Sequence, residues 1–266
     1  MRLRLTLVVL AATYGSCVWG QDKDSVNPSA ESQAFAIARA TANQMHAYAL
    51  APEKRTELAL SGPQYTFTDP ARQISSGTIW MWSNGGRPAA IMSLCSMKKL
   101  RYLEFCSFSD GTLEFTGLFG ERWRPAPAWK PIAMAGALPP DKSSQRRLSQ
   151  LKELAARFRA SAVRPSTGRT ELLRVLPRPI YRYSENSYPQ DGAIFLVVRD
   201  GDPEAALVIE TTQQDNSYTG WQFMAGNLTK NIASIFLDEQ EFKLDNASGE
   251  ALPYQMIRRT AEPDEL

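Results

Sequence analysis

The spacing of apolar residues changes along this chain, and it first follows the period of an α-helix. From position 35 onward, apolar side chains recur every three or four residues, which places them on one helical face. The positions are Phe35, Ala38, Ala42, Met45 and Ala49. The same spacing returns between residues 143 and 162, at Leu148, Leu151, Ala155, Phe158 and Ala162. Because Pro52 and Pro165 follow the two stripes and proline does not continue a helix, the sequence predicts one helix before each.

Segments after each predicted helix are rich in apolar and β-branched residues, which is typical of strands. After the first helix the predicted strands are residues 65–68, 77–83, 88–96, 101–108 and 113–118. After the second they are residues 171–176, 180–183, 193–199, 205–212, 220–227 and 233–237. Asn84-Gly85-Gly86 and Asp200-Gly201 supply the turn residues of hairpins, so neighbouring strands are expected to pair antiparallel.

Two stretches of the chain resemble each other. Residues 77–91 align without a gap on residues 192–206, and the identical pairs are Gly77/Gly192, Ile79/Ile194, Gly86/Gly201, Pro88/Pro203 and Ala90/Ala205. Background residue frequencies would give about one identity over this length. The sequence therefore predicts an α+β fold made by tandem duplication, in which each copy is one helix followed by an antiparallel sheet of about five strands.

The chain begins like an export signal. Arg2 and Arg4 precede a short apolar run at residues 5–12, and Val18 and Gly20 suit a cleavage site before Gln21. We expect a signal peptide at residues 1–20, a first repeat at 21–120, a linker rich in proline and tryptophan at 121–142, a second repeat at 143–245 and an acidic tail at 246–266. No later apolar run is long enough for a membrane-spanning helix, so the sequence predicts an exported protein that is periplasmic, envelope-associated or secreted.

Charge is balanced overall but unevenly distributed. The chain has 30 Lys and Arg and 28 Asp and Glu, and removal of Arg2 and Arg4 with residues 1–20 would leave 28 of each. A balance near zero argues against a nucleic-acid-binding protein. Residues 142–182 hold eleven basic residues and two acidic ones, whereas residues 238–266 hold eight acidic and three basic. These stretches either attract each other, or the basic one meets an anionic ligand or surface.

Cys95 and Cys106 remain after the predicted cleavage, which would remove Cys17. A hairpin turning between Leu100 and Arg101 would place Cys95 directly opposite Cys106, at a separation close to that of a disulfide. In an exported chain an even pair of cysteines is compatible with a disulfide. A bridge and two buried thiols are the alternatives.

Catalytic and metal-binding signatures are missing. His46, the one histidine, falls on the first predicted helix and has no partner identifiable in sequence. One histidine and two separated cysteines do not make a zinc site. Ser96-Met-Lys-Lys99 and Ser149-Gln-Leu-Lys152 match the Ser-x-x-Lys pattern, but its companion motifs are absent. We therefore assign no catalytic residue, metal or cofactor.

Several segments together resemble a known family. They are residues 122–127 (Arg-Trp-Arg-Pro-Ala-Pro), residues 172–183, Asp191-Gly-Ala-Ile-Phe195 and Asp202-Pro-Glu-Ala205. Over roughly residues 60–237 the chain resembles a family of uncharacterised exported proteins from planctomycete-type bacteria. The resemblance implies export and a bacterial origin, and it implies no activity.

Two functions remain open from the sequence. The first is a non-catalytic secreted or envelope protein that binds a ligand or partner at the interface of the two repeats. The alternative is an extracytoplasmic hydrolase that uses carboxylate chemistry. Two close carboxylates with raised pKa values in a cleft would favour the hydrolase, and an apolar or basic groove would favour binding.

Overall fold

The computed structural model describes residues 30–97, 100–117, 122–124, 131–164, 167–183, 191–215, 217–229, 231–244 and 256–260. Within these ranges 62% of residues lie in strands, and the α-helices are α1 (Ala30–Asn43) and α2 (Ser144–Ala156). The protein is thus mostly β, with large curled antiparallel sheets. The predicted antiparallel pairing is confirmed, but the predicted α+β tandem of one helix and about five strands per copy is wrong.

The first half of the chain forms two sheets. One has the strand order β2-β1-β7-β8, and the other has the order β18-β6-β5-β4-β3. The strands are β1 (His46–Ala51), β2 (Lys54–Glu57), β3 (Ala59–Asp69), β4 (Ile74–Asn84), β5 (Arg87–Met97), β6 (Leu100–Ser107), β7 (Thr112–Thr116), β8 (Arg122–Trp123) and, from the C-terminal region, β18 (Met256–Thr260). A short 3₁₀ helix, η1 (Pro70–Arg72), joins β3 to β4.

The second half forms one nine-stranded sheet. Its order is β17-β16-β10-β11-β13-β14-β15-β9, with β12 paired to β13. The strands are β9 (Ile132–Ala133), β10 (Phe158–Val163), β11 (Thr170–Val175), β12 (Tyr181–Tyr183), β13 (Gly192–Arg199), β14 (Asp202–Gln214), β15 (Ser217–Asn227), β16 (Ile232–Leu237) and β17 (Gln240–Leu244). The sheet curls so strongly that Asn227 at the end of β15 donates a hydrogen bond to the carbonyl of Leu244 at the end of β17.

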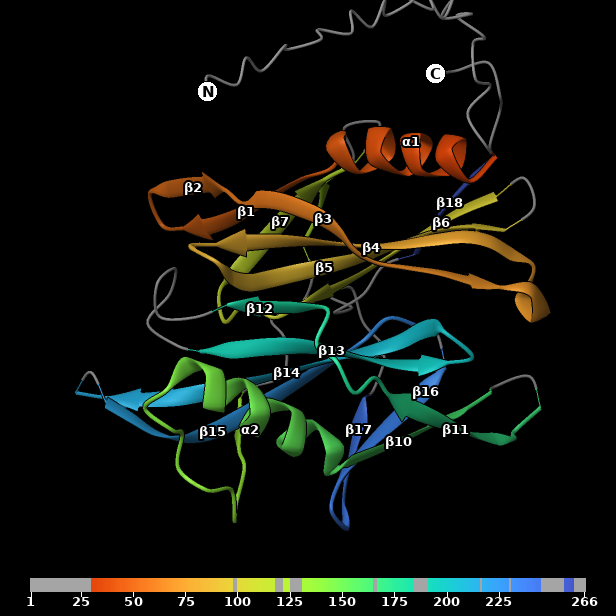
Figure 1. The fold of residues 1–266 in the computed structure, drawn as a ribbon. Helices are drawn as coiled ribbons and strands as arrows, with labels where there is room; N and C mark the ends of the chain where they lie inside the picture. The colour runs from red at the N-terminus through yellow and green to blue at the C-terminus, as the bar shows by residue number, and fades with distance from the viewer. Residues whose placement is uncertain are drawn as a thin grey trace, which may run out of the picture.

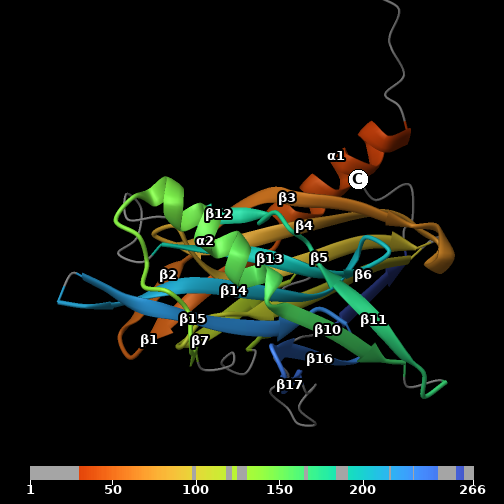
Figure 2. The ribbon, with the colours of Figure 1, turned by 60° about the horizontal axis from the view of Figure 1, so that its bottom comes forward.

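The layers run α1, first-half sheet, second-half sheet, α2 (Figure 1, with a rotated view in Figure 2). Side chains of a strand point alternately to its two faces. On β4, Trp80 and Trp82 pack with α1, whereas Ile79 and Met81 face the second half. On β13, odd-numbered side chains such as Phe195 pack with α2, and even-numbered ones face the first half. The central strands are therefore buried on both faces.

Both helices end earlier than their apolar stripes. α1 stops at Asn43, so Met45 and Ala49 lie beyond it, and α2 stops at Ala156, two residues before Phe158. Met45 and Phe158 are nevertheless buried, because β1 and β10 enter the cores that the helices cover. The apolar stripes therefore predicted the burial of Met45 and Phe158 correctly, but they predicted helices that are longer than α1 and α2.

The seam between the two halves is a packed core. Apolar side chains from β3 to β6 meet apolar side chains of β13 to β15 there. The approach is closest where Cys106 of β6 lies against Gly226 of β15, since a Cβ atom on residue 226 would overlap the Cys106 sulfur. Glycine is required at 226 by the opposite sheet, not by its own backbone conformation.

The Gly226→Ala substitution should lower the free energy of unfolding by about 1–3 kcal/mol, because it overpacks the seam. Gly111→Ala is the matched control: its new Cβ would lie 3.7 Å from the Ser109 hydroxyl, so a change within about 0.5 kcal/mol is expected. In urea unfolding, Cys106→Ala combined with Gly226→Ala should be more stable than additivity allows. Strict additivity would show that the two residues are not in contact.

Candidate functional site

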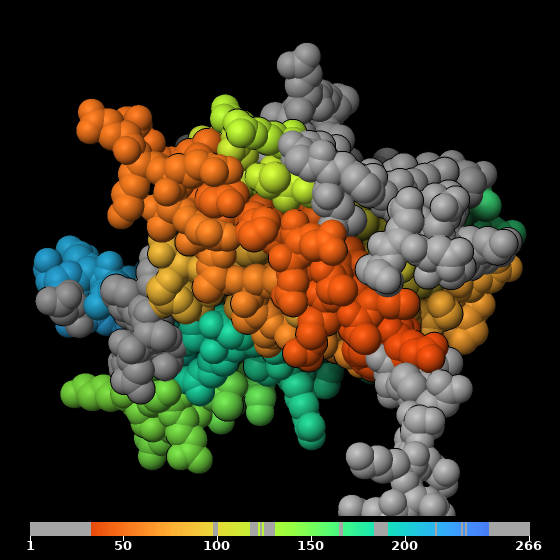
Figure 3. All heavy atoms as spheres, turned by 90° about the horizontal axis from the view of Figure 1, so that it is seen from above, coloured from red at the N-terminus to blue at the C-terminus, as the bar shows by residue number. Residues whose placement is uncertain are grey.

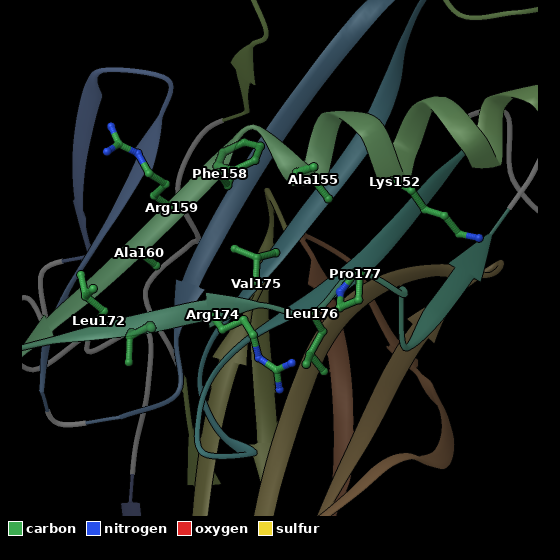
Figure 4. A pocket seen from close by; sticks show the side chains of 12 residues that line it. Lys152, Ala155, Phe158, Arg159, Ala160, Leu172, Arg174, Val175, Leu176 and Pro177 are labelled. Carbon is green, nitrogen blue, oxygen red and sulfur yellow. The ribbon is translucent and has the colours of Figure 1, made fainter.

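A hollow of about 390 Å³ opens between α2, β10 and β11. Apolar side chains form its floor: Ala155 comes from α2, Phe158 begins β10, and Val175 and Leu176 come from the end of β11 and the residue after it. Figure 4 shows Ala155, Phe158 and Val175 close together, whereas Leu176 extends away from them on the other side of β11. We call this hollow the α2–β11 groove.

The rim of the α2–β11 groove is positively charged. Lys152, Arg159 and Arg174 line it, and no acidic residue lines it in the part of the chain that the structure describes. Figure 4 shows the three charged side chains extending outward in different directions from the apolar floor. Arg159 lies 3.3 Å from Glu239, but that side chain is 96% exposed, so the pair is weak. Lys152 and Arg174 form no ion pair with any residue that the structure describes.

Alternation along β11 creates this arrangement. Leu173 is buried toward α2, whereas Leu172 and Arg174 point to the opposite face. Leu172 is 87% exposed, because the first-half sheet does not extend over this part of β11. Leu172 and Arg174 therefore also line a second hollow, of about 660 Å³, whose other wall includes Asp69 and Arg72 of the first half. We call it the seam hollow.

At the seam hollow, Arg72 of the first half contacts three carboxylates, two of which belong to the second half. Its guanidinium contacts Asp202 and Glu204 of β14, and its Nε atom lies 3.3 Å from Asp69. Arg199 approaches Glu204 at 3.0 Å. Burial raises the pKa of Asp202 to about 7; Arg72 opposes that shift, and the charge of Glu204 adds to it.

At the opposite end of β14, Glu210 makes the second polar link. Arg87 of the first half donates to its two oxygens at 3.0 Å from Nε and Nη2. Tyr183 and Gln222 donate to it at 2.5 and 2.8 Å. Glu210 is fully buried, and both of its carboxylate oxygens accept hydrogen bonds. The carboxylates at both ends of β14 thus hold the halves together.

His46 does not lie on a helix, as the sequence predicted, but opens β1. Its Nδ1 atom lies 2.7 Å from Glu57, and both side chains are about half exposed, at 47% and 56%. No serine, threonine or cysteine is hydrogen-bonded to it in the described structure. Ser149 lies on α2 and makes no hydrogen bond to Lys152 in the described structure, whereas Ser96 lies on β5 and its motif partner Lys99 falls outside the described residues. The described residues also contain no cluster of His, Cys, Asp and Glu that could hold a metal.

Cys95 and Cys106 are free and buried. The hairpin pairs Met97 with Leu100, so it turns two residues earlier than the predicted turn between Leu100 and Arg101. Cys95 consequently faces Tyr102, and Cys106 faces Ile91. Burial raises the pKa of both thiols far above the ordinary value.

Comparison of the chain with protein-family models, with curated proteins and with solved structures found no match. No helix in the described ranges has the length and apolar character needed to cross a membrane. The predicted signal peptide with Cys17, residues 121 and 125–130 of the predicted linker, and the acidic tail apart from residues 256–260 lie outside the described residues. Export, the domain limits and the family resemblance therefore stay predictions.

Cys95 and Cys106 should not react with a maleimide in the native protein, because their exposed fractions are 6% and 1% and their thiolates are disfavoured. In denaturant without a reductant, both should be labelled completely. Peptide mapping by mass spectrometry measures the labelling of Cys95 and of Cys106 individually and distinguishes it from the labelling of Cys17. Two cysteines that stay unlabelled in denaturant until a reductant is added would instead be bridged.

Replacing Asp202 should reveal an unusual dependence of stability on pH. The pKa of Asp202 is about 7 when folded and near 3.8 when unfolded, so the folded state holds an extra proton between these values. Its contribution to stability therefore falls as pH rises through that window. The unfolding free energy of the wild type minus that of Asp202→Asn should fall by more than about 1 kcal/mol from about pH 4 to about pH 8.

Asp238→Asn is the control for this measurement. The hydrogen bond from Arg157 lowers the pKa of the exposed Asp238, so its contribution is lost only below the ordinary aspartate range. Its difference curve should be flat from about pH 4 to about pH 8. A curve for Asp202→Asn that rises with pH would mean that Arg72 keeps Asp202 ionised in the folded state.

Proposed function

We propose that this protein is a non-catalytic binding protein that takes an amphiphilic anion in the α2–β11 groove. The observation that carries the proposal is the combination of an apolar floor with a rim of Lys152, Arg159 and Arg174, with no acidic residue among the described lining residues. In keeping with the export expected from the sequence, we propose that it does so outside the cytoplasm.

The apolar floor suits the hydrocarbon part of such a ligand. Ligand pockets are concave, mainly apolar and furnished with a few polar groups that orient the ligand. A volume of about 390 Å³ accommodates a single acyl-like arm and not a large folded partner. Burial of that arm against Phe158, Val175 and Leu176 would contribute roughly 25 cal/mol for each Å² of apolar surface removed from water.

The rim supports an anionic head group at the mouth of the groove. Lys152 and Arg174 have no ion-pair partner in the described structure, so a ligand need not displace an existing salt bridge. Because their charged ends point in different directions (Figure 4), they favour an exposed, adaptable head group over a buried anion cage. The expected contribution of each cation is correspondingly small.

The position of the groove also supports binding close to the interface of the two halves. Leu172 and Arg174 line both the α2–β11 groove and the seam hollow, so the two hollows adjoin at β11. The centre of the seam itself is filled by apolar side chains. A ligand larger than the groove would therefore extend past Arg174 to the edge of the seam.

The alternative of a carboxylate hydrolase has weaker support. Asp202 and Glu204 are close, and the pKa of Asp202 is raised, as that alternative required. However, both carboxylates are at most 8% exposed and are bonded to Arg72, and Glu204 also accepts from Arg199 and Asn231. Neither lines the seam hollow. Their arrangement supports cohesion of the halves rather than attack on a substrate.

Dodecyl phosphate should bind the full chain more tightly than tetraethylene glycol dodecyl ether, which has the same apolar arm and no charge. In calorimetric titrations, Arg174→Gln should weaken dodecyl phosphate binding about threefold, and added salt should reduce the difference between the two ligands. Ala156→Trp, at an exposed position lining the groove, should abolish binding of both by filling the hollow.

Arg178→Gln is the matched control, since Arg178 is exposed in the same basic stretch but does not line the groove. It should leave the affinity unchanged. Equal losses in Arg174→Gln and Arg178→Gln would indicate a diffuse basic surface and contradict the groove. Unchanged binding by a folded Ala156→Trp variant would do the same.

A further inference from the structure

A separate hollow of about 640 Å³ lies on the other side of the molecule, between the beginning of α1 and the strands β3 and β4. α1 covers the tryptophan-lined part of this sheet face through Ala38 and Ala42. One turn earlier, Phe35 overhangs the hollow with 36% of its surface exposed. Figure 3 looks down on this face, with α1 in red and orange.

The floor of the hollow carries an array of hydroxyl groups. Thr66 of β3 is directly opposite Thr78 of β4, and Phe67 is opposite Gly77. Since Phe67 points into the seam, its neighbours Thr66 and Thr68 point outward, toward the hollow. Ser76 lies two residues from Thr78 on the same strand and lines the hollow as well.

Most of these hydroxyls are available to a ligand. Thr78 is already engaged, because it donates to the carbonyl of Leu94 and accepts from the Trp80 indole. Thr66, Thr68 and Ser76 make no side-chain hydrogen bond to any part of the chain that the structure describes. Thr66 and Thr68 are exposed.

Among the residues that the structure describes, none with an ionisable side chain lines this hollow, although 22% of the residues of the chain are charged. A charged ligand would lose hydration there without gaining an ion pair. A purely apolar ligand would leave the three hydroxyls without partners. The lining therefore matches a ligand that is neutral and carries its own donors and acceptors.

We propose that the hollow between α1, β3 and β4 is a binding site for a neutral saccharide. Serine and threonine hydroxyls both donate and accept, as the hydroxyls of a sugar do. Phe35 supplies the apolar face on which the carbon–hydrogen side of a pyranose ring packs. The site is independent of the α2–β11 groove, with which it shares no lining residue.

The test uses the full chain with three neutral trisaccharides: cellotriose, maltotriose and chitotriose. At least one should bind with a dissociation constant between about 0.1 and about 10 mM and should shift the threonine methyl signals of Thr66, Thr68 and Thr78 in carbon–proton NMR spectra. The Thr66→Val/Thr68→Val variant keeps the side-chain shape and removes two hydroxyls, so it should bind about tenfold more weakly.

Thr112→Val is the matched control, because Thr112 is an exposed strand threonine of β7 that does not line the hollow. It should bind as the wild type does. The proposal is overturned if none of the three trisaccharides shifts these methyl signals at about 10 mM. It is overturned equally if binding is the same in the wild type and in a Thr66→Val/Thr68→Val variant whose melting temperature is unchanged. Neither result would bear on dodecyl phosphate binding.

Discussion

The structure depends on the burial of its central strands on both faces. Ile79 and Met81 of β4 face the seam while Trp80 and Trp82 face α1, and β13 repeats this division with Ile194 and Phe195. A sheet that is apolar on two sides must be covered on both. A helix and curled strands therefore cover the outer face of each half, and the other half covers its inner face.

Polar links fix how the two inner faces meet. Hydrophobic packing has little directionality, so the apolar seam alone would tolerate sliding of one sheet over the other. β14 presents Asp202 and Glu204 at one end of its seam face and Glu210 at the other, where Arg72 and Arg87 of the first half meet them. Breaking either pair would leave a buried carboxylate without its partner, which is far costlier than the pair itself is stabilising. The pairs thus specify register more than they add stability.

The sequence predicted the central strands well because runs of apolar and β-branched residues and the glycines of hairpin turns are local signals. The prediction failed where one apolar stripe extended over a helix and the strand that follows it. Ala47 and Ala49 of β1 are helix-favouring residues. Phe158, Ala160 and Ala162 of β10 are apolar and directly follow α2. The sequence therefore predicts helix where both strands lie. The α2–β11 groove was predictable only in its charge, through the basic stretch. Its apolar floor and the Arg72 and Arg87 links arise from contacts between residues far apart in sequence, which spacing does not encode.

The way in which α1 and α2 cover the sheets also explains where the hollows lie. Each helix is shorter than the sheet beneath it: α2 ends before it can cover β11, and the first turns of α1 leave the ends of β3 and β4 open. What each hollow can bind is then set by the residues left uncovered, which are arginine, lysine and leucine in one case and threonine, serine and phenylalanine in the other. Because neither set is needed to hold the central strands together, their chemistry could change without loss of the fold. We propose binding beside the helices and not at the seam, because the centre of the seam is already filled by apolar side chains.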